Sequence, residues 1–263
     1  MMSIQTSVIP PALAARIEEA GLNASAPPQQ RLVDGWLVRF SPGKAKRARC
    51  VNAVSAGRLS LEHKLALCQQ VFDEAALPML LRVTPFSEPH GLDALLERQG
   101  MRRLDDTRVM ACAVPSPQAA APLPNGCSLS RVGPESFAQT VGNFRGSPLA
   151  QRQAHGHRLA NAPVPFSAFV LRHEGTLAAC GQVALEGELV GLYDVFTAPP
   201  FRGRGFARGL CRQLLAHAAT AGARTAYLQV DADNQPARAV YGQLGFADVY
   251  AYHYRVPQWQ ADR

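Results

Sequence analysis

No run of apolar residues in this 263-residue chain approaches the roughly 18 that a helix needs to cross a bilayer. The segment Met1–Pro11 also lacks the basic start and apolar core of a secretory signal. We therefore expect a cytoplasmic protein with no membrane partner. The composition, 47% hydrophobic and 18% charged, is typical of a globular protein with one large or two ordinary domains.

Metal-binding patterns are missing from the cysteines. No two of them form a Cys-x-x-Cys pair, and no histidine stands at zinc-finger spacing from any pair. We expect no metal, and thiols that are reduced and mostly buried. The six are Cys50, Cys68, Cys112, Cys127, Cys180 and Cys211.

Acidic residues are fewer than basic ones, which gives a net charge of +7. This charge favours anionic partners but does not by itself separate a phosphate-bearing ligand from nucleic acid. The densest basic run, 44–49, contains no interleaved aromatic residue, which argues against a nucleic-acid partner. A solvated loop is the preferred interpretation of this run, and contact with an acidic substrate stays open.

A glycine- and arginine-rich turn is the most informative segment. Residues 189–197 predict a strand, and a helix follows the turn Arg202–Gly205. Backbone N–H groups at a helix start can point at one anion, and the helix dipole adds partial positive charge. The arginine side chains add full charges, so the turn suits a phosphate or pyrophosphate. The residues concerned are Arg202, Gly203, Arg204, Gly205, Phe206, Ala207 and Arg208.

Two other interpretations of these glycines compete with phosphate binding by this helix start. Gly203, Gly205 and Gly209 nearly form the dinucleotide-binding pattern G-x-G-x-x-G, but the last interval is one residue too long. A solvated turn without a ligand is the simpler alternative. A second segment, 227–246, weakens both: it holds a strand, an Asn-Gln-Pro-Ala helix start, a tyrosine inside the helix and a Leu-Gly-Phe exit.

Residues 202–207 fit the pattern Arg/Gln-x-x-Gly-x-Gly/Ala. Together with segment 227–246, they resemble the GCN5-related N-acetyltransferase (GNAT) superfamily, which uses acetyl-coenzyme A (acetyl-CoA). The resemblance covers about residues 126–256. It implies a strand splayed from its neighbour, with the pyrophosphate held by 202–208 and the pantetheine arm bonded by the backbone of Val195, Phe196 and Thr197. It implies no metal.

Asn234 and Tyr241 gain roles from the same resemblance. Asn234 would reach the cofactor, although it also suits a helix cap ahead of Pro236, and both roles can hold at once. Tyr241 matches the general acid of the family, since a phenol with a pKa near ~10 is protonated at neutral pH and can donate to a departing thiolate. A packing tyrosine in the core is the alternative.

Asp194 is the one carboxylate on the strand before the turn. Strand alternation places it on the face of Leu192 and Phe196. Three roles stay open: a base acting through water, a group that orients a cationic substrate, or a partner of an arginine. His155 and His157 lie in a segment without firm placement, and we expect them at the surface.

The Pro/Ala-rich stretch 115–125 predicts a linker, and a strand–helix–strand order recurs on both sides of it. We therefore expect an α/β protein with two acetyltransferase-like domains in tandem. Residues 1–114 would form a degenerate domain with a structural or cleft role, because no Arg-x-x-Gly-x-Gly/Ala follows the strand near Cys50. Residues 126–263 would form the catalytic domain.

The expected activity is acetyl transfer from acetyl-CoA to a primary amine by direct attack. The acceptor is unidentified, and a small molecule is preferred. One alternative is a regulatory module that binds acyl-CoA without turnover. Another is transfer to a protein N-terminus.

Overall fold

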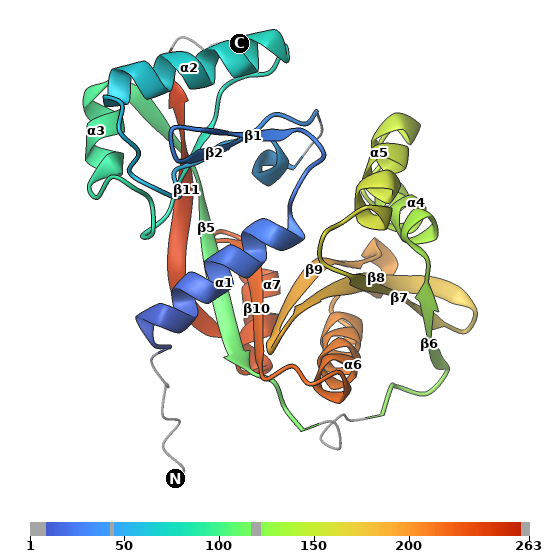
Figure 1. The fold of residues 1–263 in the computed structure, drawn as a ribbon. Helices are drawn as coiled ribbons and strands as arrows, with labels where there is room; N and C mark the ends of the chain where they lie inside the picture. The colour runs from blue at the N-terminus through green and yellow to red at the C-terminus, as the bar shows by residue number, and fades with distance from the viewer. Residues whose placement is uncertain (1–8, 43–44, 117–121, 259–263) are drawn as a thin grey trace. The chain divides into compact units, whose positions relative to one another are not determined.

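The computed structural model describes residues 9–42, 45–116 and 122–258 (Figure 1). These residues form two compact units. Unit 1 contains residues 9–24, 109–116, 122–230 and 234–249, and unit 2 contains residues 25–42, 45–108, 231–233 and 250–258. Each unit is therefore assembled from both halves of the chain.

Unit 1 is built on strands in the order β10-β9-β8-β7-β6. The strands from β6 to β9 pair antiparallel, whereas β9 and β10 pair parallel. A two-residue turn joins β7 to β8, and its residues Glu174 and Gly175 have φ of 49° and 77°, as hairpin turns of this length prefer. The strands are β6 (Cys127–Val132), β7 (Phe166–His173), β8 (Thr176–Glu186), β9 (Leu189–Thr197) and β10 (Thr225–Asp231).

Helices cover both faces of these strands. Leu210 and Leu214 of α6 pack against β8 and β9 in one core cluster, whereas Phe137 and Val141 of α4 pack with Cys180 in another. Figure 1 shows α6 on one side of β8 and α4 with α5 on the other. The helices of unit 1 are α1 (Pro11–Ala24), α4 (Pro134–Phe144), α5 (Leu149–Ala160), α6 (Phe206–Thr220) and α7 (Gln235–Gln243).

Unit 2 has strands in the order β1-β2-β3-β4-β11-β5. Its core contains Trp36 and buried side chains of α2 and α3, among them Phe72 and Leu96. The parallel pair β3–β4 brackets α2, as β9–β10 brackets α6 in unit 1. The elements are β1 (Gln30–Val33), β2 (Trp36–Arg39), β3 (Val51–Asn52), α2 (Leu61–Glu74), β4 (Leu81–Val83), α3 (Leu92–Arg98), β5 (Met101–Ala113) and β11 (Ala247–Pro257).

The predicted α/β class is confirmed, but the compact units do not follow the predicted division at 115–125. Helix α1 and residues 109–113 of β5 belong to unit 1, and residues 250–257 of β11 belong to unit 2. The physical reason is burial: Met110 and Cys112 lie in the core of unit 1, while β11 pairs with β4 through residues 253–255.

The predicted linker is only partly described, because residues 117–121 lie outside the described residues. Leu123, near its end, packs against the core of unit 1. At least this end of the stretch is therefore part of a packed unit and not a free tether.

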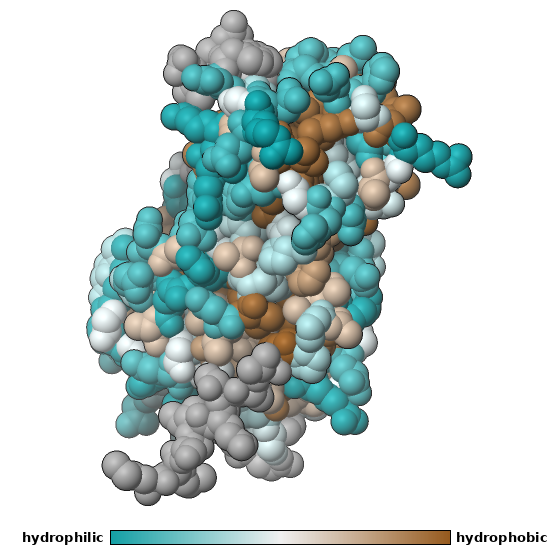
Figure 2. All heavy atoms as spheres, turned by 90° about the vertical axis from the view of Figure 1, so that its left-hand side faces the viewer, coloured by the Kyte–Doolittle hydropathy of each residue, from teal (hydrophilic) through white to brown (hydrophobic). Residues whose placement is uncertain are grey.

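Hydrophilic side chains cover most of the face shown in Figure 2, with hydrophobic side chains interspersed. Large hydrophobic side chains exposed among the described residues are Leu32, Val54, Leu59, Leu67 and Leu149. Single exposed apolar residues of this kind are ordinary on protein surfaces. No helix in the described part of the chain has both the length and the apolar character to span a membrane.

Candidate active site

Strands β9 and β10 separate partway along their length. Their parallel pairing runs from Leu189 opposite Thr225 to Leu192 opposite Leu228, and β9 then continues to Thr197 paired only with β8. Residues 193–197 therefore leave β10, as the sequence resemblance implies. A strand edge that a neighbouring strand leaves can bind an extended ligand in the manner of an added strand.

A β-bulge lies on β9 where the two strands separate. Tyr193 pairs with Gln182 and Phe196 with Cys180, so two residues of β9 oppose the single residue Gly181. Asp194 has a φ of 50°, a left-handed conformation that is uncommon for a residue with a side chain. The bulge interrupts the strand alternation. Asp194 lies on the same side as Phe196, where both meet residues at the C-terminal end of α4, but Leu192 lies in the core against α6, so the predicted grouping of Asp194 with Leu192 is wrong.

The turn after β9 has the backbone that its glycines predict. Gly203 and Gly205 have φ of 72° and 81°, and Gly205 caps the N-terminus of α6. The first backbone N–H groups of a helix have no intrahelical acceptor. No atom outside the immediate chain lies within 4 Å of a Cβ built on either glycine, so the space beside the turn is open.

Three arginines surround this turn. Nε of Arg202 donates to the carbonyl oxygen of Thr197 at 3.2 Å, and its guanidinium lies 5.5 Å from the ring centroid of Phe196. Arg204 lies over the ring of Phe206 at 5.2 Å. Nη1 of Arg208 donates to Oε1 of Gln243 at 3.0 Å. All three arginines are exposed, so their charges can attract an anion from solvent.

The Asp194 carboxylate is held from three sides. Gln182 Nε2 donates to Oδ2 at 2.8 Å, Arg145 Nη1 lies 2.8 Å from Oδ1, and His155 Nε2 lies 3.3 Å from Oδ2. Burial alone would raise the pKa of Asp194. The contact with His155 and the charges of Arg145, His155 and Arg158 outweigh burial and hold this pKa well below its usual range.

Sequence reasoning missed Arg145, His155 and Gln182. They come from the end of α4, from α5 and from β8, so only the fold brings them to the bulge. His155 was expected at the surface, yet its side chain is only 20% exposed and faces Asp194. The available signal was composition: residues 134–160 contain three arginines and a single acidic residue.

Replacing Asp194 with asparagine should destabilise unit 1 by about 1–3 kcal/mol, because Arg145 and His155 lose a buried anionic partner. Arg145 contributes the smaller part, since it is 38% exposed and screened by solvent. Because the pKa of Asp194 is lower in the folded state than in the unfolded state, its carboxylate stabilises the fold at a pH above the unfolded pKa of about 4. This stabilisation is lost as the pH falls below that value. Urea unfolding should therefore show a difference at pH 7 that shrinks at pH 3; equal stability at pH 7 would contradict the ion pair.

Tyr241 is partly buried on α7 and packs against the main core of unit 1. Its ring meets Phe246 edge to face at 5.9 Å. Burial, and then the neighbouring Cys211, raise the pKa of the Tyr241 phenol above its ordinary value. The hydroxyl is therefore protonated at neutral pH. Packing and proton donation are both compatible with this placement.

Asn234 caps helix α7, and its side chain accepts a hydrogen bond from Ala237 N at 3.2 Å. Its predicted contact with a cofactor stays a prediction. Cys211 and Cys180 are fully buried, and burial raises the pKa of each thiol to about 12. Neither supplies the thiolate that a covalent acetyl-enzyme would need.

In unit 2, the turn before α2 binds the side-chain carboxylate of Asp34. The carboxylate of Asp34 accepts hydrogen bonds from Arg58 N at 2.9 Å and Leu59 N at 2.8 Å, and Lys64 Nζ lies 3.3 Å away. These bonds, that of Leu59 first, lower the pKa of Asp34. Gly57 has a φ of 71°, and a side chain there would collide with Asp34 and Lys64. Asp34 therefore occupies the backbone N–H groups of Arg58 and Leu59 at this turn.

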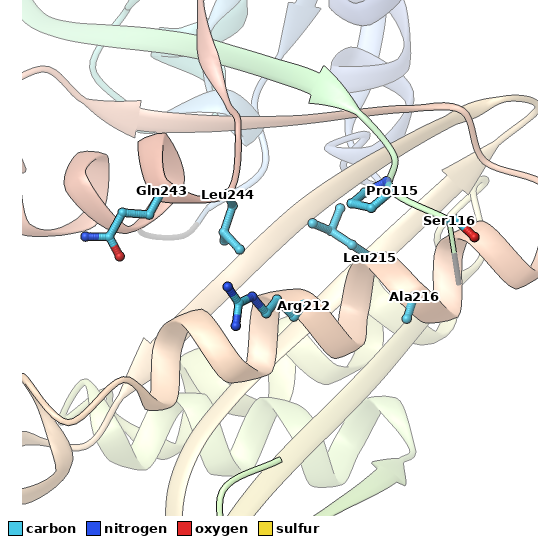
Figure 3. Close-up of a pocket in the computed structure, with 7 residues that line it drawn as sticks. All are labelled: Pro115, Ser116, Arg212, Leu215, Ala216, Gln243 and Leu244. Atoms are coloured by element: carbon cyan, nitrogen blue, oxygen red, sulfur yellow. The ribbon is translucent and has the colours of Figure 1, made fainter. Parts of the chain in front are cut away.

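A pocket of about 150 Å³ lies elsewhere in unit 1 (Figure 3). Figure 3 shows Arg212 on α6 facing Gln243 and Leu244 across the hollow. None of its lining residues belongs to the bulge or the glycine turn, so we do not take it for the active site. Among the described residues, no group of His, Cys, Asp and Glu is placed to hold a metal ion.

The Acetyltransferase (GNAT) family matches residues 140–246, the segment that holds the bulge, the glycine turn, α6, β10 and α7. These residues form a GNAT acetyltransferase domain. The predicted resemblance is thereby confirmed for this part of the chain, and the match supports an acyltransferase.

Similar proteins extend over most of the chain. The chain is 25% identical over 233 residues to the uncharacterized N-acetyltransferase YobR of Bacillus subtilis (strain 168). The aligned region covers 86% of this chain and 92% of that protein. A GCN5-related N-acetyltransferase from Kribbella flavida has a TM-score of 0.65 at 17% identity, covering 94% and 96% of the two chains. A tandem GNAT protein from the clavulanic acid biosynthesis pathway has a TM-score of 0.62 at 17% identity, covering 74% and 68%. The tandem GNAT fold is therefore shared.

Proposed function

We propose that unit 1 transfers an acetyl group from acetyl-CoA to a primary amine by direct attack. The observation that carries this proposal is the separation of β9 from β10 directly before the glycine turn of α6. The edge of β9 is followed in the chain by a helix start that suits a phosphate. Coenzyme A needs both, because its extended pantetheine arm ends in a pyrophosphate. The GNAT match supports the same reaction class.

The residues present fit this donor. The turn offers open space, helix N–H groups and three exposed arginines. The buried Oγ1 of Thr197 has no hydrogen-bond partner among the described residues, and such atoms usually find one in the working protein. Residues 202–208 would hold the pyrophosphate and 195–197 the pantetheine arm; bound acetyl-CoA would supply the activated thioester.

The chain itself would manage the protons. Tyr241, kept protonated by its raised pKa, would donate to the departing thiolate. Asp194 accepts a proton weakly because its pKa is depressed, so we assign it to the orientation of Arg145 and His155. The proton of the attacking amine would pass to water. The burial of Cys180 and Cys211 argues against a covalent acetyl-enzyme at either thiol and supports direct attack.

Unit 2 would then have a structural role. Its turn before α2 is filled by Asp34, so we propose that it binds no coenzyme.

Calorimetry with acetyl-CoA tests the binding part of the proposal. We expect one site per chain in the native protein and an affinity at least about tenfold weaker in Gly205→Glu, because a carboxylate would enter the cradle. Gly205→Ala is the matched control, since it introduces the same backbone strain at φ 81° without charge and should keep most of the affinity. Two sites, or native affinity in Gly205→Glu, would overturn the assignment.

Thiol release in the presence of an amine library tests the chemistry. Small amines, polyamines and a peptide with a free N-terminus form its three arms, so a response confined to the peptide would favour N-terminal acetylation. If the protein binds acetyl-CoA but none of the amines causes thiol release, it would be a regulatory acyl-CoA-binding module instead.

A further inference from the structure

The carboxylate beside the proposed reaction centre is not available to a cationic acceptor. Asp194 already contacts Arg145 at 2.8 Å, Gln182 at 2.8 Å and His155 at 3.3 Å. Its charge is compensated within the protein, and its side chain is only 19% exposed. A polyamine or another multiply charged cation would find no free carboxylate at this bulge.

Arg145, in contrast, has capacity left. It caps the C-terminus of α4, its side chain is 38% exposed, and Nη1 is the atom that faces Asp194. A guanidinium carries five N–H donors in a planar fork that matches carboxylate and phosphate oxygens. Asp194 holds the guanidinium through Nη1, and the partly exposed side chain can still bind a second anion.

The surrounding charge has the same sign. Arg158 acts electrostatically on Asp194 from α5, and residues 134–160 hold three arginines and two histidines but one acidic residue, Glu135. Arg145, His155 and Arg158, whose charges act on Asp194, are all basic. Gln182 is 1% exposed and its Oε1 has no hydrogen-bond partner among the described residues, which leaves an acceptor that a ligand N–H or a water could satisfy.

We propose that the acceptor amine also carries an anionic group, a carboxylate or a phosphate, and that Arg145 binds this group. Arg158 adds positive charge, and Asp194 positions the Arg145 guanidinium. This inference rests on the proposed acetyl transfer and names its substrate class: a small zwitterionic or anionic amine and not a polycation.

Matched pairs of amines test the inference by thiol release with acetyl-CoA. The pairs are glycine against glycinamide and phosphoethanolamine against ethanolamine, with spermidine as the polycation. We expect kcat/KM at least about tenfold higher for the anionic member of at least one pair, and the pair that responds separates carboxylate from phosphate.

Arg145→Gln should reduce that preference to about threefold or less, chiefly by raising KM for the anionic amine, whereas Arg145→Lys should retain part of it. Arg224→Gln is the matched control: Arg224 is 78% exposed in a surface ion pair with Glu188, and its loss should leave the preference unchanged. Calorimetry with acetyl-CoA verifies that each variant is folded. Should Arg145→Gln fail to fold, Arg158→Gln should lower the same preference.

Faster turnover of neutral amines or spermidine, or an unchanged preference in Arg145→Gln, would overturn this inference while leaving acetyl transfer intact. Acetyl-CoA binding without thiol release from any amine would refute the proposed function, and the acceptor inference with it.

Discussion

Tyr241→Phe should lower kcat by about 10²–10⁴ and leave the affinity for acetyl-CoA nearly unchanged. The phenol is partly buried, and burial keeps it protonated. Phenylalanine retains the edge-to-face contact with Phe246 and the packing against the core, so only the donated proton is removed. The rate loss would therefore measure proton transfer to the leaving thiolate.

Steady-state thiol release and calorimetry on the same preparations separate the two effects. Tyr193→Phe is the matched control, because it removes a hydroxyl that lies 3.0 Å from the Tyr227 hydroxyl in the same unit, outside the α7 site. A native rate in Tyr241→Phe would show that the tyrosine only packs and that water protonates the thiolate.

Much of the fold follows from local sequence signals. The Pro at the start of 134–144 and the largely apolar run 189–197 predict α4 and β9 with the bounds that the structure has. Gly205 predicts the left-handed helix cap because a residue without a Cβ adopts it at no steric cost. Such features depend on a few neighbouring residues.

Features that depend on distant pairing could not be predicted. The bulge at Asp194 arises because β9 has one more residue than β8 between two paired positions, which no pattern within β9 reveals. Arg145 and His155 reach Asp194 only when two helices pack on the strand. Asp34 fills the turn before α2 from 24 residues away.

The assignment of segments to units is the largest departure of this kind. A linker in the middle of a chain suggests that each side folds by itself. Here Met110 and Cys112 precede the linker yet lie in the core of unit 1, and Ala24 of α1 packs with Val164 and Ala184. Tyr252 and Tyr254 follow the segment that matches the GNAT family yet are buried in unit 2, on the strand that pairs with β4.

The fragment 126–263 should therefore fail to fold as a stable, active protein. It would lose the core side chains of residues 109–112 and the cover of α1, and it would expose the buried tyrosines of β11. Removal of one large core side chain typically costs about 2–5 kcal/mol, against a total stability of about 5–15 kcal/mol. We expect aggregation or a molten state, measured by size-exclusion chromatography and near-UV circular dichroism.

A nicked protein is the control that separates missing segments from a missing covalent link. With a protease site inserted into 115–125, the full-length protein should stay associated after cleavage and keep most of its thermal stability. Each piece still contributes to both units, because residues 109–113 of β5 belong to unit 1 and residues 250–257 of β11 belong to unit 2. Dissociation into two folded halves, or a well-behaved and fully active fragment 126–263, would show that the halves fold independently and that the buried segments at 109–112 and in α1 contribute little.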